Sequence, residues 1–117
     1  MGSALRELAR RAPLPVSIAT TEERFAPDAE TTAYFVAIEA LTNAVKHAHA
    51  SRVALSADRR DGALVLRVAD DGIGGATPHE GSGLSGMADR LAAVGGTLQV
   101  DSGHTGTTLI ASIPCAS

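Results

Sequence analysis

Residues 68–75 read VADDGIGG, an apolar strand pattern that ends in two carboxylates and runs directly into glycines. Such a strand presents Asp70 at its tip, and the glycines let the backbone turn with no side chain in the way. An ionised carboxylate accepts a hydrogen bond from the exocyclic amine of adenine. Guanine has a carbonyl there, and the unpaired acceptors would cost about 1–3 kcal/mol. The stretch favours an adenine site. A plain acidic turn is the alternative, since an EF-hand calcium loop would need further oxygen ligands that are missing.

A second signal is a polar row in the chain segment before this strand. Glu39, Asn43 and His47 recur at every fourth position, and Phe35 extends the row. A solvent-facing row is the alternative, although a half-exposed helix normally carries a broader charged face. Carboxylate and amide oxygens suit Mg²⁺, which keeps waters and phosphates as its other ligands. Lys46 and His47 are placed to reach phosphate oxygens.

The third signal is GSGLSG (residues 81–86), which opens a predicted helix. Free backbone N–H groups at a helix start bind phosphate, and glycines allow a close approach. The string also matches the dinucleotide fingerprint GxGxxG, with Asp101 at a suitable distance. That fingerprint needs a strand leading straight into its first glycine, and residues 76–80 (ATPHE) contain a proline instead. A P-loop is excluded because GxxxxGK[ST] does not occur in the sequence.

Hydrophobic periodicity predicts helices and hairpins in alternation. The helices are expected over residues 4–11, 28–48 and 83–94, and the strands over 16–20, 53–57, 64–68, 97–101 and 107–113. Asp28 is the expected N-cap of the long helix, and Asp61–Gly62 the turn of the first hairpin. Three helices against one mixed, mostly antiparallel sheet make an α/β two-layer sandwich.

Apolar side chains at helical spacing predict which face of each helix is buried. On the long helix they are Tyr34, Ile38, Leu41 and Val45; on the last they are Leu84, Met87, Leu91 and Val94. Aromatic residues are few, at 3% of the chain, so we expect an aliphatic core rich in alanine.

Length and charge narrow the classes of protein. The 117 residues fit one domain spanning 1–117, in which residues 1–3 read like a cloning scar or a trimmed start. The net charge of −3 and the lack of a basic cluster argue against nucleic acid. The single cysteine, Cys115, fits a reducing cytoplasm, and no apolar run approaches the ~18 residues of a membrane span. We therefore expect a cytoplasmic location without direct membrane contact.

Four motifs in this order resemble the N, G1, G2 and G3 boxes of the GHKL ATP-binding superfamily. They are Glu-x-x-x-Asn-x-x-Lys-His (39–47), Asp-x-Gly-x-Gly (70–74), Gly-x-Gly-Leu-x-Gly-Met (81–87) and Gly-Thr (106–107). Three longer segments resemble the catalytic ATP-binding domain of bacterial sensor histidine kinases: EALTNAVKHA, VADDGIGG and GSGLSGMADRLAAVGGTLQV. The similarity is strongest to the branch that pairs with nitrate-regulator-type response regulators. The resemblance spans about residues 28–114 and implies the Bergerat fold, with ATP and Mg²⁺ as cofactors.

The resemblance also implies a role for each matching residue. Glu39 and Asn43 would be the catalytic residues, and Asn43 the Mg²⁺ ligand. Asp70 would bind adenine, supported by Thr107. The remaining nucleotide contacts would come from Lys46, His47, Gly72, Ile73, Gly74, Gly81, Ser82, Gly83, Leu84, Gly86 and Met87. Residues 75–82 resemble a short ATP lid, in which Ser82 stands where the branch often has histidine.

No segment resembles the dimerisation helix that carries the phosphorylated histidine in such kinases. The resemblance therefore implies a domain that supplies ATP, metal and positioning, with the acceptor histidine on a separate dimerisation domain and a response regulator as indirect partner. Two alternatives stay open. An anti-sigma-factor serine kinase would share the pocket but phosphorylate serine, and a nucleotide-binding module without activity would use a degenerate pocket for protein contacts.

Overall fold

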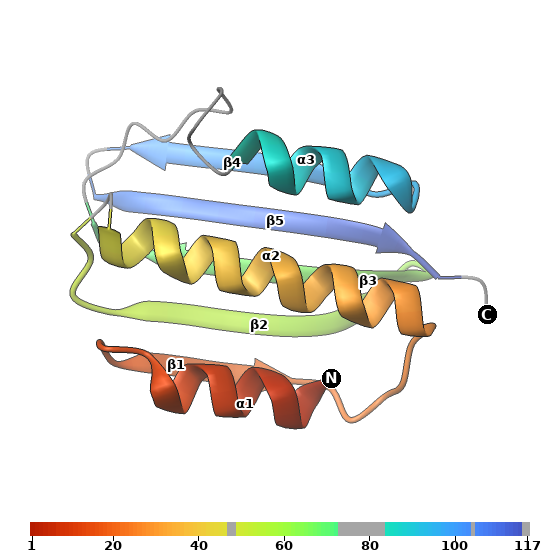
Figure 1. Cartoon of the computed structure of the whole chain (residues 1–117), viewed down its shortest axis with the longest axis horizontal. Coiled ribbons are helices and arrows are strands. Elements are labelled where there is room, and N and C mark those ends of the chain that lie inside the picture. Colours follow the sequence, from red (N-terminus) through yellow and green to blue (C-terminus); the bar gives the residue numbers. More distant parts are fainter. Residues whose placement is uncertain (47–48, 73–83, 104, 116–117) are drawn as a thin grey trace.

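The computed structural model describes residues 1–46, 49–72, 84–103 and 105–115. Their helices and strands alternate as the sequence predicts (Figure 1). The helices are α1 (Gly2–Arg11), α2 (Pro27–Lys46) and α3 (Leu84–Ala93); the strands are β1 (Val16–Thr20), β2 (Val53–Arg60), β3 (Ala63–Asp70), β4 (Thr97–Gly103) and β5 (Gly106–Pro114).

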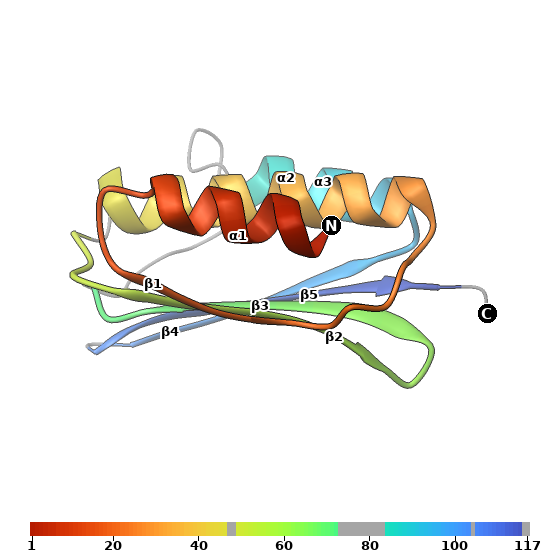
Figure 2. The ribbon, with the colours of Figure 1, turned by 90° about the horizontal axis from the view of Figure 1, so that it is seen from below.

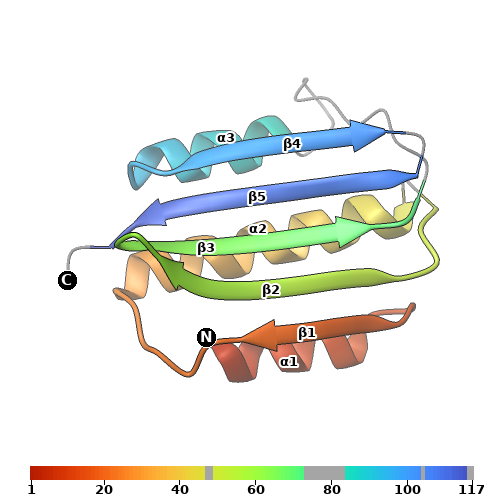
Figure 3. The same ribbon diagram turned by 180° about the vertical axis from the view of Figure 1, so that it is seen from behind.

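The five strands form one sheet in the order β1-β2-β3-β5-β4. Only the β1–β2 pair is parallel, because α2 carries the chain back across the sheet between these strands. The other three pairs are antiparallel. All three helices cover one face (Figure 2), and none of the described residues forms a helix on the other face (Figure 3). The predicted two-layer α/β sandwich is confirmed.

The hairpin between β2 and β3 shows why the sequence determines this register. Asp61 and Gly62 both have positive φ, 51° and 76°, as a two-residue type I′ turn requires. Arg60 therefore pairs with Ala63, and the alternating apolar residues of both strands reach the helix-covered face. The buried side chains on that face are Val53, Leu55 and Ala57 of β2, Leu64, Leu66 and Val68 of β3, and Leu109, Ala111 and Ile113 of β5.

The buried face of α2 differs from the predicted one. The helix packs on the sheet through a stripe of mostly small side chains: Ala29, Ala33, Val36, Ala37, Ala40, Leu41 and Ala44. Of the predicted stripe only Leu41 is buried; Tyr34 and Ile38 are half-buried, and Val45 is 36% exposed. Methyl groups let the helix lie close to the sheet, and the larger side chains fill its flanks. The alanine-rich core is confirmed.

Some helix and strand limits also shift. α2 begins at Pro27, so Asp28 lies in the first turn rather than at the N-cap. α1 begins at Gly2, two residues before the predicted start, and α3 is described from Leu84. Four strands extend further than predicted, by one to three residues at the ends, because their pairings continue as far as the turns.

Candidate functional site

The candidate site is built on a row of paired residues at one end of the sheet. Asp70 pairs with Val53 of β2 on one side and with Thr107 of β5 on the other, and Thr107 pairs with Ser102 of β4. The alternation of buried residues along β3 and β5 places Asp70 and Thr107 on the helix-covered face. The structure therefore brings together the two residues predicted to bind the base.

The Asp70 carboxylate is held in one orientation by the backbone that follows it and can act as a hydrogen-bond acceptor. Its Oδ1 accepts a hydrogen bond of 2.9 Å from the N–H of the buried Gly72, which fixes the carboxylate as the chain leaves β3. Within the described part of the chain no donor is recorded for the other oxygen, Oδ2. A half-buried carboxylate with one fixed and one open oxygen fits the exocyclic amine of adenine.

Thr107 is the polar neighbour of this carboxylate. It is only 6% exposed, and its hydroxyl lies 3.0 Å from the hydroxyl of Ser102. A buried hydroxyl in such a pair keeps a fixed orientation, since leaving it unpaired would cost free energy. This arrangement suits the supporting role predicted for Thr107.

Gly106 is a site residue that the assignment from sequence left out. It has a φ of 143°, and a Cβ built on it would lie 1.9 Å from the carbonyl oxygen of Asp70. Only glycine allows β5 to pass the end of β3 at this distance. The signal available in the sequence was the glycine directly before Thr107, at the start of the strand.

The polar row of α2 lies along the seam between α2 and α3. The Arg90 guanidinium of α3 lies over the Phe35 ring, 4.3 Å from its centroid. Glu39 and Asn43 follow Phe35 at successive turns on the same face of α2, and both are half-buried. Figure 1 shows the last turn of α2 at the end of the sheet where β3 ends and β5 begins. At Phe35 the row therefore faces a neighbouring helix, while Glu39 and Asn43 continue it towards this end of the sheet.

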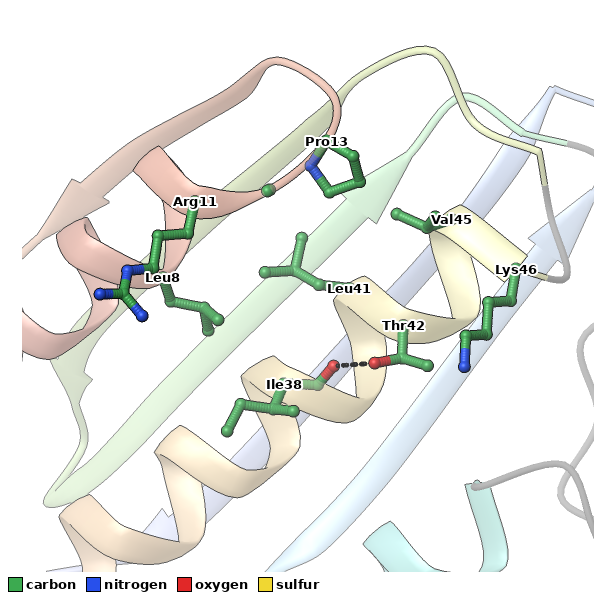
Figure 4. Close-up of a pocket in the computed structure, with 9 residues that line it drawn as sticks. Leu8, Arg11, Pro13, Ile38, Leu41, Thr42, Val45 and Lys46 are labelled. Carbon is green, nitrogen blue, oxygen red and sulfur yellow. Dashed lines mark hydrogen bonds between the residues drawn. The ribbon is translucent and has the colours of Figure 1, made fainter.

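The opposite flank of α2 borders an apolar groove of about 260 Å³ against α1. Figure 4 shows the groove, which is lined by Leu8, Arg11, Ala12, Pro13, Ile38, Leu41, Thr42, Val45 and Lys46. The Thr42 hydroxyl donates a hydrogen bond of 2.9 Å to the Ile38 carbonyl. Lys46 lies at one end of the groove, its side chain is exposed, and its ammonium points away from Pro13 (Figure 4).

The first residues of α3 have two different environments. Leu84 and Met87 are 2% and 0% exposed, because their side chains belong to the core beneath the helix. Gly86 is exposed, and a Cβ there would meet nothing within 4 Å. The predicted nucleotide contacts of Leu84 and Met87 therefore rest on their backbone. The other predicted contacts, His47, Ile73, Gly74, Gly81, Ser82 and Gly83, lie outside the described residues.

Asp71, the second carboxylate of the strand end, has a role that the sequence did not indicate. It binds the segment after α2 through hydrogen bonds from Ser51 and Arg52. The Ser51 hydroxyl, followed by the backbone N–H groups of Arg52 and Ser51, lowers the pKa of Asp71 to about 2. The two adjacent carboxylates are therefore used differently: Asp71 binds the segment after α2, while Asp70 accepts only the Gly72 N–H among the described residues and faces the helix-covered side of the sheet.

Comparison with known proteins identifies the family of this chain. Residues 28–117 match the family described as histidine kinase-, DNA gyrase B-, and HSP90-like ATPase, and the chain belongs to that family. Within the family it is an ATP-binding catalytic domain of the two-component histidine kinase type, as its curated relatives show.

The relatives are much longer than this chain. Signal transduction histidine-protein kinase/phosphatase UhpB of Salmonella typhimurium is 42% identical over 85 residues, which cover 71% of this chain and 17% of that protein. Oxygen sensor histidine kinase NreB of Staphylococcus carnosus is 36% identical over 97 residues, which cover 79% of this chain and 28% of that protein. The chain therefore spans less than a third of the length of either relative.

A solved structure shows the same fold. The histidine kinase domain of the Erythrobacter litoralis EL346 blue-light activated histidine kinase superimposes with a TM-score of 0.75 at 24% identity, covering 96% of this chain and 56% of that one. None of the helices in the described ranges is long and apolar enough to cross a membrane.

Proposed function

We propose that this domain binds ATP together with Mg²⁺ and presents the γ-phosphate to a histidine on a separate dimerisation domain of a parent sensor kinase. The observation that carries the proposal is the position of Asp70. Its carboxylate stands at the end of β3, on the helix-covered face and beside Thr107, at the end of the sheet reached by the last turn of α2. ATP binding follows from the family; the residue roles, the metal and the acceptor are the proposal.

Adenine specificity would come from the two strand residues. Asp70 accepts the exocyclic amine through Oδ2, because Oδ1 is occupied by the Gly72 N–H. Thr107 supports the base from the next strand, and the buried Gly72 leaves the backbone bare where the base and ribose would approach. The open acceptor at Asp70 would reject guanine, which has a carbonyl at that position.

Residues of α2 would bind the triphosphate and its cation. The Asn43 side-chain oxygen is the proposed Mg²⁺ ligand, and Glu39, one turn earlier on the same face, would orient a ligand water. When bound, the cation neutralises phosphate charge during phosphoryl transfer. Lys46 is exposed at the last turn of α2 and belongs to none of the ion pairs found among the described residues, so its ammonium is available to a phosphate oxygen. Residues 75–82 are the proposed lid.

We place the acceptor histidine outside residues 1–117. Of the four histidines, His49 is exposed and has a φ of 52° at the turn after α2; the other three lie outside the described residues. A backbone position in that region is usually fixed by turn geometry, so His49 serves the turn. A response regulator would then receive the phosphoryl group from the parent kinase, which we place with this domain in the cytoplasm.

The first experiment is calorimetric titration of the domain with ATP, ADP and GTP, each with and without Mg²⁺. We expect ATP to bind, Mg²⁺ to strengthen the binding, and GTP to bind at least about tenfold more weakly, as one unpaired acceptor implies. Equal affinity for ATP and GTP would refute the role of Asp70. No binding at millimolar nucleotide would favour the module without activity.

A second experiment identifies the acceptor. The parent kinase is incubated with Mg²⁺ and γ-labelled ATP, and the product is treated with acid. Phosphohistidine is labile in acid, whereas phosphoserine survives. Acid-stable label would overturn the histidine kinase proposal in favour of a serine kinase.

A further inference from the structure

Asp71 joins two segments that are 20 positions apart in the chain. Its Oδ1 accepts the backbone N–H groups of Ser51, at 2.8 Å, and of Arg52, at 3.1 Å. The Ser51 hydroxyl donates to Oδ2, and the Arg52 guanidinium lies 3.7 Å from the same oxygen. One carboxylate thus binds the backbone that leads from α2 into β2.

The bound backbone is itself attached to the end of α2. The N–H of Ala50 donates a hydrogen bond of 3.0 Å back to the carbonyl of Ala44, and His49 between them has a φ of 52°. This bond joins residues six positions apart and attaches the segment 50–52 to the last turn of α2. Ala50 and the residues after it, Ser51 and Arg52, are therefore tied to the end of the helix.

The two ends of this connection are the two halves of the candidate site. Asp71 is covalently next to Asp70, which the strand β3 holds beside Thr107. Ala44 is covalently next to Asn43 and lies half a turn from Lys46. Through Ser51 and Ala50, Asp71 links the base end of the site to the phosphate end.

We propose that Asp71 is a positioning residue that sets the distance between the adenine-binding end and the metal- and phosphate-binding end of the site. The inference rests on the proposed function. Asp71 touches neither the base nor the metal; its effect passes through the end of α2. The affinity for nucleotides that contact both ends of the site therefore depends on Asp71, and the affinity for ligands that contact only the base end does not.

The test measures adenosine and Mg²⁺–ATP affinity in the wild type, Asp71→Ala and Asp71→Asn. We expect Asp71→Ala to weaken Mg²⁺–ATP by about five- to tenfold, while adenosine stays within about twofold. Asp71→Asn keeps an acceptor oxygen for the two N–H groups and should recover part of the loss. Ser51→Ala removes only the hydroxyl bond and should weaken Mg²⁺–ATP by about two- to threefold. Asp58→Asn, at an exposed carboxylate whose partners are Arg59 and Arg60 in the same strand, is the control and should change neither affinity.

The outcomes separate this inference from the proposed function. Equal losses of adenosine and Mg²⁺–ATP would mean that Asp71 supports the fold or the base end alone, and the inference would be wrong. Unchanged affinities in both Asp71 variants would also overturn it. If Asp71→Ala does not fold, Ser51→Ala decides by the same comparison. A wild-type domain that binds neither ligand would overturn the proposed function and this inference together.

Discussion

Gly106 lies so close to Asp70 that no side chain fits between them: a Cβ on Gly106 would stand 1.9 Å from the Asp70 carbonyl oxygen. The contact joins the start of β5 to the end of β3, whose last residue carries the proposed base-binding carboxylate. The orientation of Asp70 therefore depends on a residue with no functional group of its own.

Gly106→Ala should destabilise the domain by at least about 2 kcal/mol, because the backbone at a φ of 143° and the end of β3 cannot both keep their positions. It should also weaken ATP binding. Chemical denaturation and titration with ATP measure the two effects. Gly103→Ala, in the same hairpin with open space around its Cβ, is the matched control and should be nearly neutral.

Asp70→Asn should weaken ATP binding by about tenfold or more, the value of a charge-assisted hydrogen bond. Stability should change little, since the amide oxygen can still accept the Gly72 N–H. Calorimetry with ATP and a thermal melt without nucleotide separate the two. Unchanged ATP affinity would remove Asp70 from the base-binding role.

Asn43→Ala should lower metal-dependent phosphotransfer and Mg²⁺–ATP affinity more than affinity for ATP in EDTA. The reason is that Asn43 is proposed to act on the cation, while the base is bound by β3 and β5. Titrations with and without Mg²⁺ report the difference. A loss of equal size in both would refute the metal assignment; Thr42→Ala, which faces the groove against α1, serves as the neighbouring control.

The contact between Arg90 and Phe35 should contribute about 0.5–1 kcal/mol to the packing of α3 on α2. A double-mutant cycle with Arg90→Met and Phe35→Leu measures this coupling energy from unfolding curves. Arg59, whose guanidinium lies 4.6 Å from the Phe25 ring, offers a second cycle away from the site. Only the first pair should also affect nucleotide binding, because Phe35 lies one turn from Glu39 on the same face of α2.

The free energy of unfolding at acid pH should report the hydrogen bonds to Asp71. Its pKa is about 2 in the folded domain, against about 3.9 for an ordinary aspartate, so ionisation of Asp71 favours folding above pH 4. This contribution is lost as the pH falls from about 4 towards 2. The difference in unfolding free energy between the wild type and Asp71→Asn should shrink over that range and stay constant from pH 5 to 7. A constant difference down to pH 2.5 would contradict the assignment.

The features that local sequence determines were predicted. The Asp61–Gly62 turn fixes the pairing of β2 with β3, and the alternation on both strands follows from it. The position of Asp70 at a strand end was predicted for the same reason. Each of these depends on residues only a few positions apart.

Apart from helix and strand limits, the errors concern contacts between distant segments. Val45 and Ala44 are adjacent, and which of them faces the sheet depends on where α1 and the strands lie. An apolar repeat predicts a helix but does not determine how the helix is rotated about its own axis against the sheet. Alanine is also a weak signal for burial. Asp71 gave no signal because its partners are 20 positions away. Gly106 was part of the quoted Gly-Thr motif, but its close contact with the Asp70 carbonyl could not be predicted, because it joins two distant strands.

The alanine stripe of α2 sets the height of the helix above the sheet. A methyl group at Ala40 or Ala44 holds the C-terminal half of the helix close to β3 and β5, so the spacing between Asn43 and Asp70 is determined by the smallest side chains nearby. A larger residue at either alanine would lift the proposed cation-binding end of the site away from the proposed base-binding end, although no polar residue would have changed. Attempts to redesign nucleotide preference must therefore hold these two alanines constant, although neither is expected to touch ATP.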